Sequence, residues 1–337
     1  MIDRPGPSGP GQRPAGGTNL PAPVSIVIVT WNSARYIADC LRSLRDLRRP
    51  PAETVVLDNA STDGTPEIVR GGFPEVVFIP NGANLGFCRA NNLGIARTAS
   101  PFVLVLNPDT RLGGEFLEEL LPVFEDARVG MASGKLLRFD GKTIDSAGQE
   151  LSRSRQPKDR GYGRRDTGQF DRDQEVFGVC GAAALYRRTM LVDLAARDGS
   201  FFDESFFAFY EDLDIAWRAR RRGWKAAYRH RAIGLHARGG TAHGPRLLRR
   251  LAALLGRDPE IRFHIAKNRY MTILRNDTPR GYVSNLPFIL ARDLGMAALL
   301  LLSSPGVLRR LWRERAFFRR ALELRRSDAV RPVPVRD

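Results

Sequence analysis

Short apolar runs alternate with segments of helical periodicity through the first third of the chain. Val24–Thr30 reads VSIVIVT, an uninterrupted β-branched run that is typical of a strand buried on both faces. Between Tyr36 and Leu47 the apolar residues recur at helical spacing, which predicts an amphipathic helix. The same reasoning predicts strands at 54–57, 76–79 and 102–106, a helix that opens at Thr65, and a helix at 87–96. This alternation favours an α/β fold with a doubly wound, mainly parallel sheet and flanking helices.

Polar residues follow three of these predicted strands directly. The clusters are Thr30-Trp31-Asn32, Asp58-Asn59 and Asn107-Pro108-Asp109. Ligands of such sheets bind outside the carboxyl ends of the strands, so three polar strand ends indicate a small-molecule site. No GxGxxG or GxxxxGK[ST] motif follows any strand, which excludes a dinucleotide fingerprint and a P-loop.

The middle of the chain is less regular. Residues 153–172 are polar and charged, which predicts a mobile loop. Asp212–Arg222 predicts a short helix that Gly223 terminates, and Ala226–Leu235 predicts one more strand.

Residues 276–337 predict a helical extension of a different character. The run at 283–302 is apolar, but Pro287 and the charged pair at 292–293 interrupt it, and the remaining stretch is shorter than the roughly 20 residues of a membrane span. Residues 309–326 mix arginine with Leu, Trp and Phe, which is typical of a basic amphipathic helix on a membrane surface. A helical cap that packs on the preceding domain would show the same pattern.

Composition divides the 337 residues into three parts. Residues 1–23 are rich in Pro and Gly and have no apolar run, which predicts a disordered leader and not a signal peptide. Residues 24–275 form the predicted α/β domain, and residues 276–337 form the extension. The three cysteines are far apart and lack metal-binding spacing, which argues against a disulfide framework or a zinc site and favours the cytosol.

The formal net charge of +16 is unevenly distributed. From Arg246 onward there are 20 Lys and Arg against 8 Asp and Glu, whereas the rest of the chain is nearly balanced. A basic region indicates a polyanionic neighbour, such as a phosphorylated substrate or an anionic membrane surface, and a codon bias toward arginine is the alternative. We expect no nucleic-acid partner, because no recognisable RNA- or DNA-binding module with interleaved basic and aromatic residues is present.

Six sequence blocks occur in the order typical of glycosyltransferase family 2. They are VSIVIVTWNS (24–33), DNASTDGT (58–65), NLGFCRANN (84–92), LNPDT (106–110), CGAAALYRR (180–188) and FYEDLDIAWRARRRGW (209–224). One block would be weak, but six in order are specific, and residues 24–275 most resemble the bacterial rhamnosyltransferase-like branch. The resemblance implies a GT-A fold and an inverting transfer from a nucleoside diphosphate sugar, with deoxythymidine-diphosphate-rhamnose as the suggested donor.

Asp58 is expected to bind the base of the donor. A carboxylate at a strand end can accept the N3–H of uracil or thymine, and the resemblance implies this use, with Thr30 and Asn32 lining the same base and ribose pocket. An Asx turn or helix cap is the alternative for Asp58, although Asn59, Ser61 and Asp63 can supply such turns instead.

Asn84, Gly86, Asn91 and Asn92 form a second polar cluster. Glycine lets a backbone approach a ligand closely, and neutral amides can bind ribose or base without adding charge. We expect Asn84, Gly86 and Asn91 to contribute to the nucleotide-sugar site, while a plain helix cap would also explain Asn84.

Asn107-Pro108-Asp109 occupies the position of the family's DxD motif, with Asn107 in place of the first Asp. Mg²⁺ or Mn²⁺ prefers oxygen ligands and is shared between carboxylates and substrate phosphates. The resemblance makes Asp109 the main protein ligand and places Asn107 beside the donor. His236 matches a metal or phosphate contact of some relatives, whereas a lone histidine is more often structural, and His243 is a weaker candidate.

Glu211-Asp212 opens the predicted helix, where the positive end of the dipole favours a carboxylate. An inverting transfer needs one general base to remove the proton of the acceptor hydroxyl. The resemblance assigns that role to Asp212 and leaves Glu211 to orient it, and a capping box without catalysis is the alternative. Asp214 and Arg218 lie at i,i+4 and are expected to pair.

The resemblance, together with the basic C-terminal extension, implies a metal-dependent glycosyltransferase of cell-envelope polysaccharide synthesis, peripheral at the inner face of the cell membrane, with a glycan or polyprenyl-linked acceptor. Gly181–Ala183 would form a small-residue floor, and Tyr162, Arg164 and Arg165 would contact an acceptor phosphate. A nucleotidyltransferase would need a Gly-rich first loop, which TWNSARY is not. A processive membrane-embedded synthase would need clean membrane spans.

Overall fold

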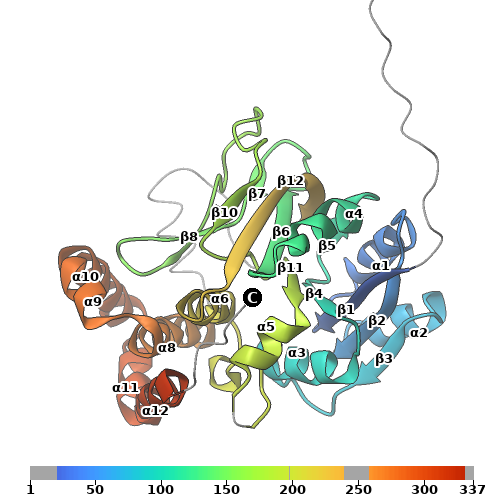
Figure 1. Cartoon of the computed structure of the whole chain (residues 1–337). Coiled ribbons are helices and arrows are strands. Elements are labelled where there is room, and N and C mark those ends of the chain that lie inside the picture. The colour runs from blue at the N-terminus through green and yellow to red at the C-terminus, as the bar shows by residue number, and fades with distance from the viewer. Residues whose placement is uncertain (1–20, 197, 239–257, 331–337) are drawn as a thin grey trace, which may run out of the picture.

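The computed structural model describes residues 21–196, 198–238 and 258–330. Its first half alternates strand and helix as the apolar pattern predicts. The elements are β1 (Ala22–Thr30), α1 (Ile37–Arg45), β2 (Pro51–Asp58), α2 (Thr65–Gly72), β3 (Val77–Pro80), α3 (Gly86–Arg97) and β4 (Phe102–Leu106). β4, β1, β2 and β3 pair side by side in parallel, so three polar strand ends fall at one edge of the sheet (Figure 1).

The second half completes a ten-stranded mixed sheet of order β10-β12-β6-β11-β4-β1-β2-β3, with β5 and β7 paired off this path. The elements are β5 (Thr110–Leu112), α4 (Phe116–Leu120), the 3₁₀ helix η1 (Leu121–Glu125), β6 (Val129–Leu137), β7 (Ile144–Ser146), β8 (Gln149–Leu151), β9 (Pro157–Asp159), β10 (Gln174–Val176), β11 (Ala183–Arg187), α5 (Arg188–Leu194), the 3₁₀ helix η2 (Glu204–Phe206), α6 (Glu211–Arg221) and β12 (Lys225–His236). β12 runs parallel to β6, while β11 is antiparallel between β6 and β4. The predicted α/β class is confirmed.

The central strands are buried on both faces because helices cover both sides of the sheet. Ile26 and Ile28 of β1 belong to an apolar cluster with Leu41 of α1 on one face. Val27 belongs to the opposite cluster, together with Ile95 of α3. All five side chains are buried, which explains why the strand reads as a continuous apolar run.

The predicted loop at 153–172 contains regular structure, so that prediction is wrong over part of its length. β9 pairs with β8 as a hairpin, with Gln149 opposite Asp159. The tip of the hairpin is fixed by Arg155, which donates to Asp277 at 2.6 Å. Neither strand alternates apolar and polar residues, which is the pattern that would have predicted a hairpin.

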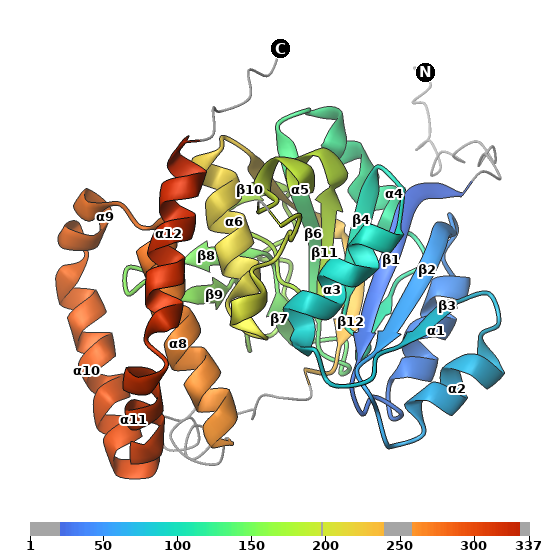
Figure 2. The ribbon, with the colours of Figure 1, turned by 90° about the horizontal axis from the view of Figure 1, so that it is seen from below.

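Within the described residues, five helices follow β12: α8 (Pro259–Asn276), α9 (Pro279–Ser284), α10 (Leu286–Ser303), α11 (Pro305–Arg313) and α12 (Ala316–Val330). They form a group beside α6, with α9, α10 and α11 farthest from the sheet (Figure 2). The sequence predicts that the catalytic domain ends at residue 275, but this position lies inside α8, one residue before the helix ends. His243 and most of the predicted leader lie outside the described residues.

α10 is one continuous helix of 18 residues, because Pro287 lies in its first turn, where proline is tolerated. By length and composition it is apolar enough to cross a membrane, with a mean hydropathy of 1.7 and only 17% of it buried. The expectation that this run is too short is therefore revised.

Candidate active site

The polar ends of β1 and β2 lie side by side. The parallel register places Thr30 opposite Asp58, and Oγ1 of Thr30 donates to the Asp58 carboxylate at 2.7 Å. Asp58 is only 2% exposed. Two of the predicted donor-binding residues therefore form one unit at the carboxyl edge of the sheet.

The Asp58 carboxylate also closes the turn after β2. It accepts from the backbone N–H of Ser61 at 2.9 Å and from its hydroxyl at 2.6 Å. The expectation that the turn forms without Asp58 is therefore wrong, although a carboxylate has about four acceptor positions and one of them remains. Asn32 accepts from the N–H of Thr62 at 2.9 Å and thereby joins the loops that follow the two strands.

Asn84 and Gly86 have roles inside the protein. The side-chain oxygen of Asn84 accepts from the N–H of Gly86 at 2.9 Å, which is an Asx turn before α3 and not a cap, because the N-cap residue is Leu85. Gly86 has a φ of +76°, and a Cβ added there would meet the ring of Phe207 at 2.5 Å. The close approach that requires glycine is therefore made by Phe207, which corrects the expectation that a ligand makes it.

The two neighbouring asparagines of α3 differ in role. Asn92 exchanges hydrogen bonds with the backbone of Phe202, each at 2.9 Å, and thereby holds the segment before α6. Asn91 donates to the carbonyl of Phe87, and its side-chain oxygen is buried without a hydrogen-bond partner among the described residues. Asn91 therefore keeps a free acceptor, and Asn92 does not.

The two predicted metal ligands meet although they are far apart in the sequence. β5 pairs with the end of β12, with Thr110 opposite His236, so the residue before β5 faces the last residue of β12. As a result, Oδ1 of Asp109 lies 3.2 Å from Nε2 of His236. Asn107 lies beside them through its backbone, whose N–H donates to the carbonyl of Ala182 at 2.9 Å.

A third residue, Asp145 of β7, completes this group, and no sequence motif indicates it. Its Oδ2 lies 2.7 Å from Nδ1 of His236, and Arg138 and Arg238 contact its other oxygen at 2.8 and 3.2 Å. Burial alone would lower the pKa of His236, but its hydrogen bonds to Asp109 and Asp145 raise that pKa to about 9. The carboxyl pKa of Asp145 is lowered, because His236 and Arg238 outweigh the effect of burial.

This group suits a divalent cation. Histidine ligands of metals commonly donate their second ring N–H to a carboxylate, and Asp145 occupies that position relative to His236. Asp109 and His236 would be the protein ligands. No cluster of three or more His, Cys, Asp or Glu ligands occurs within the described ranges, so donor phosphates and water would complete the coordination shell.

Glu211 and Asp212 open α6 as predicted, directly after Tyr210 in the left-handed conformation. Asp212 accepts from the side-chain amide of Gln149 at 2.6 Å and from the N–H of Leu213 at 2.8 Å. Gln149 begins the β8–β9 hairpin, and no sequence signal points to it. It fixes the orientation of the Asp212 carboxylate.

The two carboxyl groups of this pair share less than two negative charges near neutral pH. Burial, and then the charge of Asp212, raise the pKa of Glu211 to about 8. Burial, and then Asp159, raise the pKa of Asp212 above that of an ordinary Asp. Oε2 of Glu211 is buried and has no hydrogen-bond partner in the part of the chain that the structure describes. Raised carboxyl pKa values of this kind are typical of general bases.

The segment before β11 joins the two halves of the site. The carbonyl of Ala182 accepts from the N–H of Asn107, next to the candidate metal ligands. The N–H of Gly181 lies 3.4 Å from the Asp212 carboxylate. The predicted small-residue floor, Gly181–Ala183, therefore lies between the candidate cation site at Asp109 and His236 and the carboxylate pair Glu211–Asp212.

The sequence model of glycosyl transferase family 2 matches residues 25–194, which is half of the chain. The chain belongs to glycosyl transferase family 2. It is a glycosyltransferase, as the six sequence blocks predict.

This glycosyltransferase is similar to an N-acetylglucosaminyl-diphospho-decaprenol L-rhamnosyltransferase of Mycobacterium tuberculosis. The two are 29% identical over 236 residues, which cover 63% of this chain and 75% of the relative. Among solved structures, it resembles a mannosyltransferase of Pyrobaculum calidifontis in complex with GDP-Man and Mn²⁺, with a TM-score of 0.52, 17% identity, and coverage of 92% of this chain and 87% of that one. It also resembles GalNAc-T7 with UDP, GalNAc and Mn²⁺, with a TM-score of 0.53, 14% identity, and coverage of 75% and 48%. The structural likenesses show the fold.

The backbone that leads into the carboxylate pair of the glycosyltransferase is strained. Phe207, Phe209 and Tyr210 have positive φ angles of 66°, 71° and 71°. Such angles are costly for bulky residues and persist only where the surroundings enforce them. Asn268 of α8 supplies that constraint, because its amide nitrogen lies 2.7 to 2.9 Å from the carbonyl oxygens of residues 206, 208 and 209.

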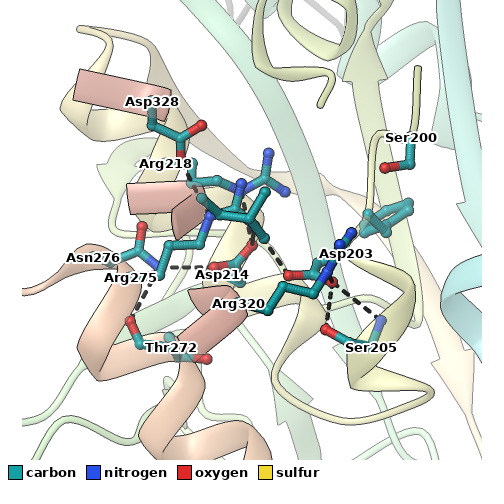
Figure 3. Close-up of polar contacts among 12 residues, drawn as sticks. Ser200, Asp203, Ser205, Asp214, Arg218, Thr272, Arg275, Asn276, Arg320 and Asp328 are labelled. Carbon is teal, nitrogen blue, oxygen red and sulfur yellow. Dashed lines mark hydrogen bonds and ion pairs between the residues drawn. The ribbon is translucent and has the colours of Figure 1, made fainter. Parts of the chain in front are cut away.

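A buried ion network anchors α6 of the glycosyltransferase to the C-terminal helices (Figure 3). Arg218 donates to Asp214 at 2.7 Å, which confirms the predicted i,i+4 pair. Arg275 of α8 lies 3.5 Å from Asp214 and 3.4 Å from Asp203, and it also reaches Asp328 of α12 at 3.1 Å. The C-terminal helices therefore hold both ends of the segment that carries Glu211 and Asp212.

Of the predicted acceptor contacts, Tyr162 lies against the two arginines that contact Asp145 in the candidate cation site. The guanidinium groups of Arg238 and Arg138 lie 4.5 and 5.0 Å from its ring centre. Arg164 and Arg165 are held by their backbones against the strand that carries Asp145. A phosphate contact for their side chains stays a prediction.

Proposed function

We propose that this glycosyltransferase inverts the anomeric centre and transfers a sugar from a nucleoside diphosphate donor to a lipid-linked glycan in cell-envelope polysaccharide synthesis. The observation that carries the proposal is the meeting of two groups across Gly181 and Ala182: the Asp109–His236 pair, and the oriented Asp212 carboxylate. A cation site on one side and one base on the other suit a single displacement.

On the donor side, Asp58 keeps one acceptor position for a pyrimidine imide, and Asn91 offers a buried amide oxygen. Deoxythymidine-diphosphate-rhamnose is the favoured donor, in keeping with the rhamnosyltransferase relative. Asp109 and His236 would hold Mg²⁺ or Mn²⁺, which when bound would neutralise charge on the departing diphosphate. Asn107 leaves this site one carboxylate short of a DxD motif, so we expect cation binding to be weak without the donor.

On the acceptor side, the Asp212 carboxylate takes the proton of the attacking hydroxyl. The acceptor oxygen bonds to the anomeric carbon as the bond from that carbon to the diphosphate oxygen breaks, and the nucleoside diphosphate leaves with the electron pair. Gln149 and the N–H of Leu213 hold the base during the transfer. Glu211 retains its proton near neutral pH, because its pKa is raised to about 8, and so it adds no second charge beside Asp212.

The proposed acceptor lies in a membrane, and the C-terminal helices offer a surface for it. Leu294, Leu302 and Trp312 are 70%, 88% and 71% exposed. Arg309 and Arg313 are exposed on the adjoining α11, where they can face anionic headgroups. We place the enzyme at the cytoplasmic face of the membrane, where nucleotide sugars are available.

Transfer assays test this function. The purified protein is incubated with a panel of nucleotide sugars, Mg²⁺ or Mn²⁺, and an N-acetylglucosaminyl diphosphate lipid, while release of nucleoside diphosphate is followed. We expect Asp212→Asn to lose about 10²-fold or more of kcat and to keep donor binding. Glu118→Gln, an exposed carboxylate on α4, is the control and should keep normal turnover. Normal turnover in Asp212→Asn would disprove the base assignment, and retained anomeric configuration in the NMR spectrum of the product would disprove inversion.

A further inference from the structure

An apolar groove with a volume of about 1050 Å³ lies between the C-terminal helices, apart from the catalytic residues. Its volume is at the upper end of the range for small-molecule sites. Its apolar lining comes from α8, α9, α11 and α12 and includes Ile273, Leu274, Val283, Leu308, Leu311 and Phe318. A hydrocarbon-lined groove of this size indicates an apolar ligand.

The groove lining has more arginines than carboxylates. Arg315, Arg319 and Arg325 line it, and the first two are exposed at its edge. Its two carboxylates are already paired: Asp277 with Arg155 at 2.6 Å, and Asp293 with a buried arginine of α8 at 2.9 Å. The net charge that remains suits a membrane surface with anionic headgroups.

The groove lies next to exposed apolar surface. α10 is apolar and only 17% of it is buried, and Trp312, which lines the groove, is 71% exposed. Hydrocarbon at this level would cover both the helix and the groove opening.

The groove is connected to the catalytic base through the β8–β9 hairpin. Asp277 at the groove is paired with Arg155 at the hairpin tip. The other end of β8 carries Gln149, which binds Asp212. β8 itself advances only about 7 Å between its first and last residues. An acceptor chain that followed this hairpin from Asp212 toward Asp277 would arrive at the groove.

We propose that the groove binds the isoprenoid chain of the lipid-linked acceptor, an inference that rests on the function proposed above. The diphosphate and sugar of the acceptor lie toward Asp212, the chain lies between α8 and α12, and the arginines at the edge face the headgroups of the membrane. The enzyme thereby selects acceptors by the length of their lipid.

The test compares two acceptors with the same diphosphate sugar, one on a long polyprenyl chain and one on a chain of two isoprene units. Leu274→Trp and Leu308→Trp each fill the groove from a different wall, and Leu322→Trp, on α12 but outside the lining, is the control. We expect both groove variants to raise KM for the long-chain acceptor about tenfold, equivalent to about 1.4 kcal/mol, with KM for the short one unchanged. The proposal is overturned if neither groove variant changes the ratio of the two KM values, whether both values stay the same or both rise equally.

Direct binding separates this proposal from the proposed function. A photoreactive polyprenyl phosphate is cross-linked to the full-length protein, and the labelled peptides are mapped. Labelling of α8 and α12 that Leu274→Trp abolishes and Leu322→Trp leaves intact supports the groove even if no sugar transfer is found. If α8 and α12 are not labelled, or if Leu274→Trp leaves their labelling as intact as Leu322→Trp does, the groove does not bind the chain, whatever the transfer assay shows.

Discussion

Nδ1 of His236 lies 2.7 Å from Oδ2 of the fully buried Asp145, on the opposite side of the imidazole from Asp109. Asp145 therefore fixes the ring so that Nε2 faces the candidate cation site. Residues that orient a metal-binding histidine in this way commonly affect metal affinity almost as strongly as the ligands themselves.

We predict that Asp145→Asn weakens Mn²⁺ binding by about 10- to 100-fold in the presence of donor, because the amide no longer enforces the required ring orientation. Binding is measured by calorimetry or by electron paramagnetic resonance of Mn²⁺. Asp159→Asn is the matched control, since it removes a carboxylate that pairs with Arg238 and does not touch His236. Equal Mn²⁺ affinity in Asp145→Asn and the unmodified protein would contradict the orienting role.

Glu211 makes the protein less stable as pH rises. Its pKa is raised to about 8 in the folded protein and is near 4.5 when unfolded. Between these values the unfolded chain has lost a proton that the folded chain still holds, so the free energy of unfolding falls by at most about 1.4 kcal/mol per pH unit. Glu211→Gln lacks this titration, and we expect its stability relative to the unmodified protein to increase between pH 5.5 and pH 7.5.

Urea unfolding at several pH values measures this difference. Glu118→Gln, at an exposed site on α4, serves as the control and should give a difference that is independent of pH. The idea fails if Glu211→Gln also shows no pH-dependent difference, because Glu211 would then ionise as an ordinary exposed carboxylate does.

Asn268 is predicted to act as a positioning residue for the base. Its amide holds the carbonyls at 206–209, so Asn268→Ala should let the left-handed residues relax and should move Asp212. Displacements of about 1 Å at a reacting group can cost about 10²-fold in rate, and we expect a loss of kcat of that order. The donor KM should stay unchanged, because Asn268 lies on the side of the carboxylate pair and not beside Asp58.

Kinetics and thermal unfolding together distinguish positioning from simple destabilisation. Asn285→Ala, a polar residue at the start of α10, is the control and should leave kcat intact. A fall in kcat/KM that follows only the loss of folded protein, with kcat per folded molecule unchanged, would rule out the positioning role.

The sequence predicts the elements of the α/β half well, because its information is local there. The apolar run that ends at Thr30 and the polar residue at Asp58 define two strand ends, and parallel pairing then forces them together. Asp212 is equally predictable, since it stands in a motif at a helix start. For these residues, local pattern and topology suffice.

The residues that orient His236 and Asp212 were not predictable in this way. Asp145, Gln149 and Asn268 act through contacts with residues 91, 63 and 59 or more positions away, and none of them stands in a recognisable motif. Gly86 shows the converse, because its conformation is required by packing against Phe207 and not by a ligand. Such tertiary contacts become visible only when the chain has folded.

The ion network between α6 and the C-terminal helices leads to the last prediction. Burial would raise the pKa of Asp214, but Arg275, Arg218 and Asn276 together lower it, so this carboxylate is charged in the folded protein. Arg275→Met leaves that buried charge with one cation fewer. We expect a loss of about 3 to 5 kcal/mol in the free energy of unfolding at neutral pH, as for other broken buried pairs.

The matched control is Glu260→Gln, which breaks the more exposed pair of Glu260 with Arg310 and should cost less than about 1 kcal/mol. Because the folded pKa of Asp214 is lowered, its contribution is present above the unfolded value near 3.8 and is lost as pH falls below it. The gap between Arg275→Met and the unmodified protein should therefore narrow in acid. A small loss at neutral pH, or a gap that does not depend on pH, would mean that α6 is held by apolar packing and not by these charges.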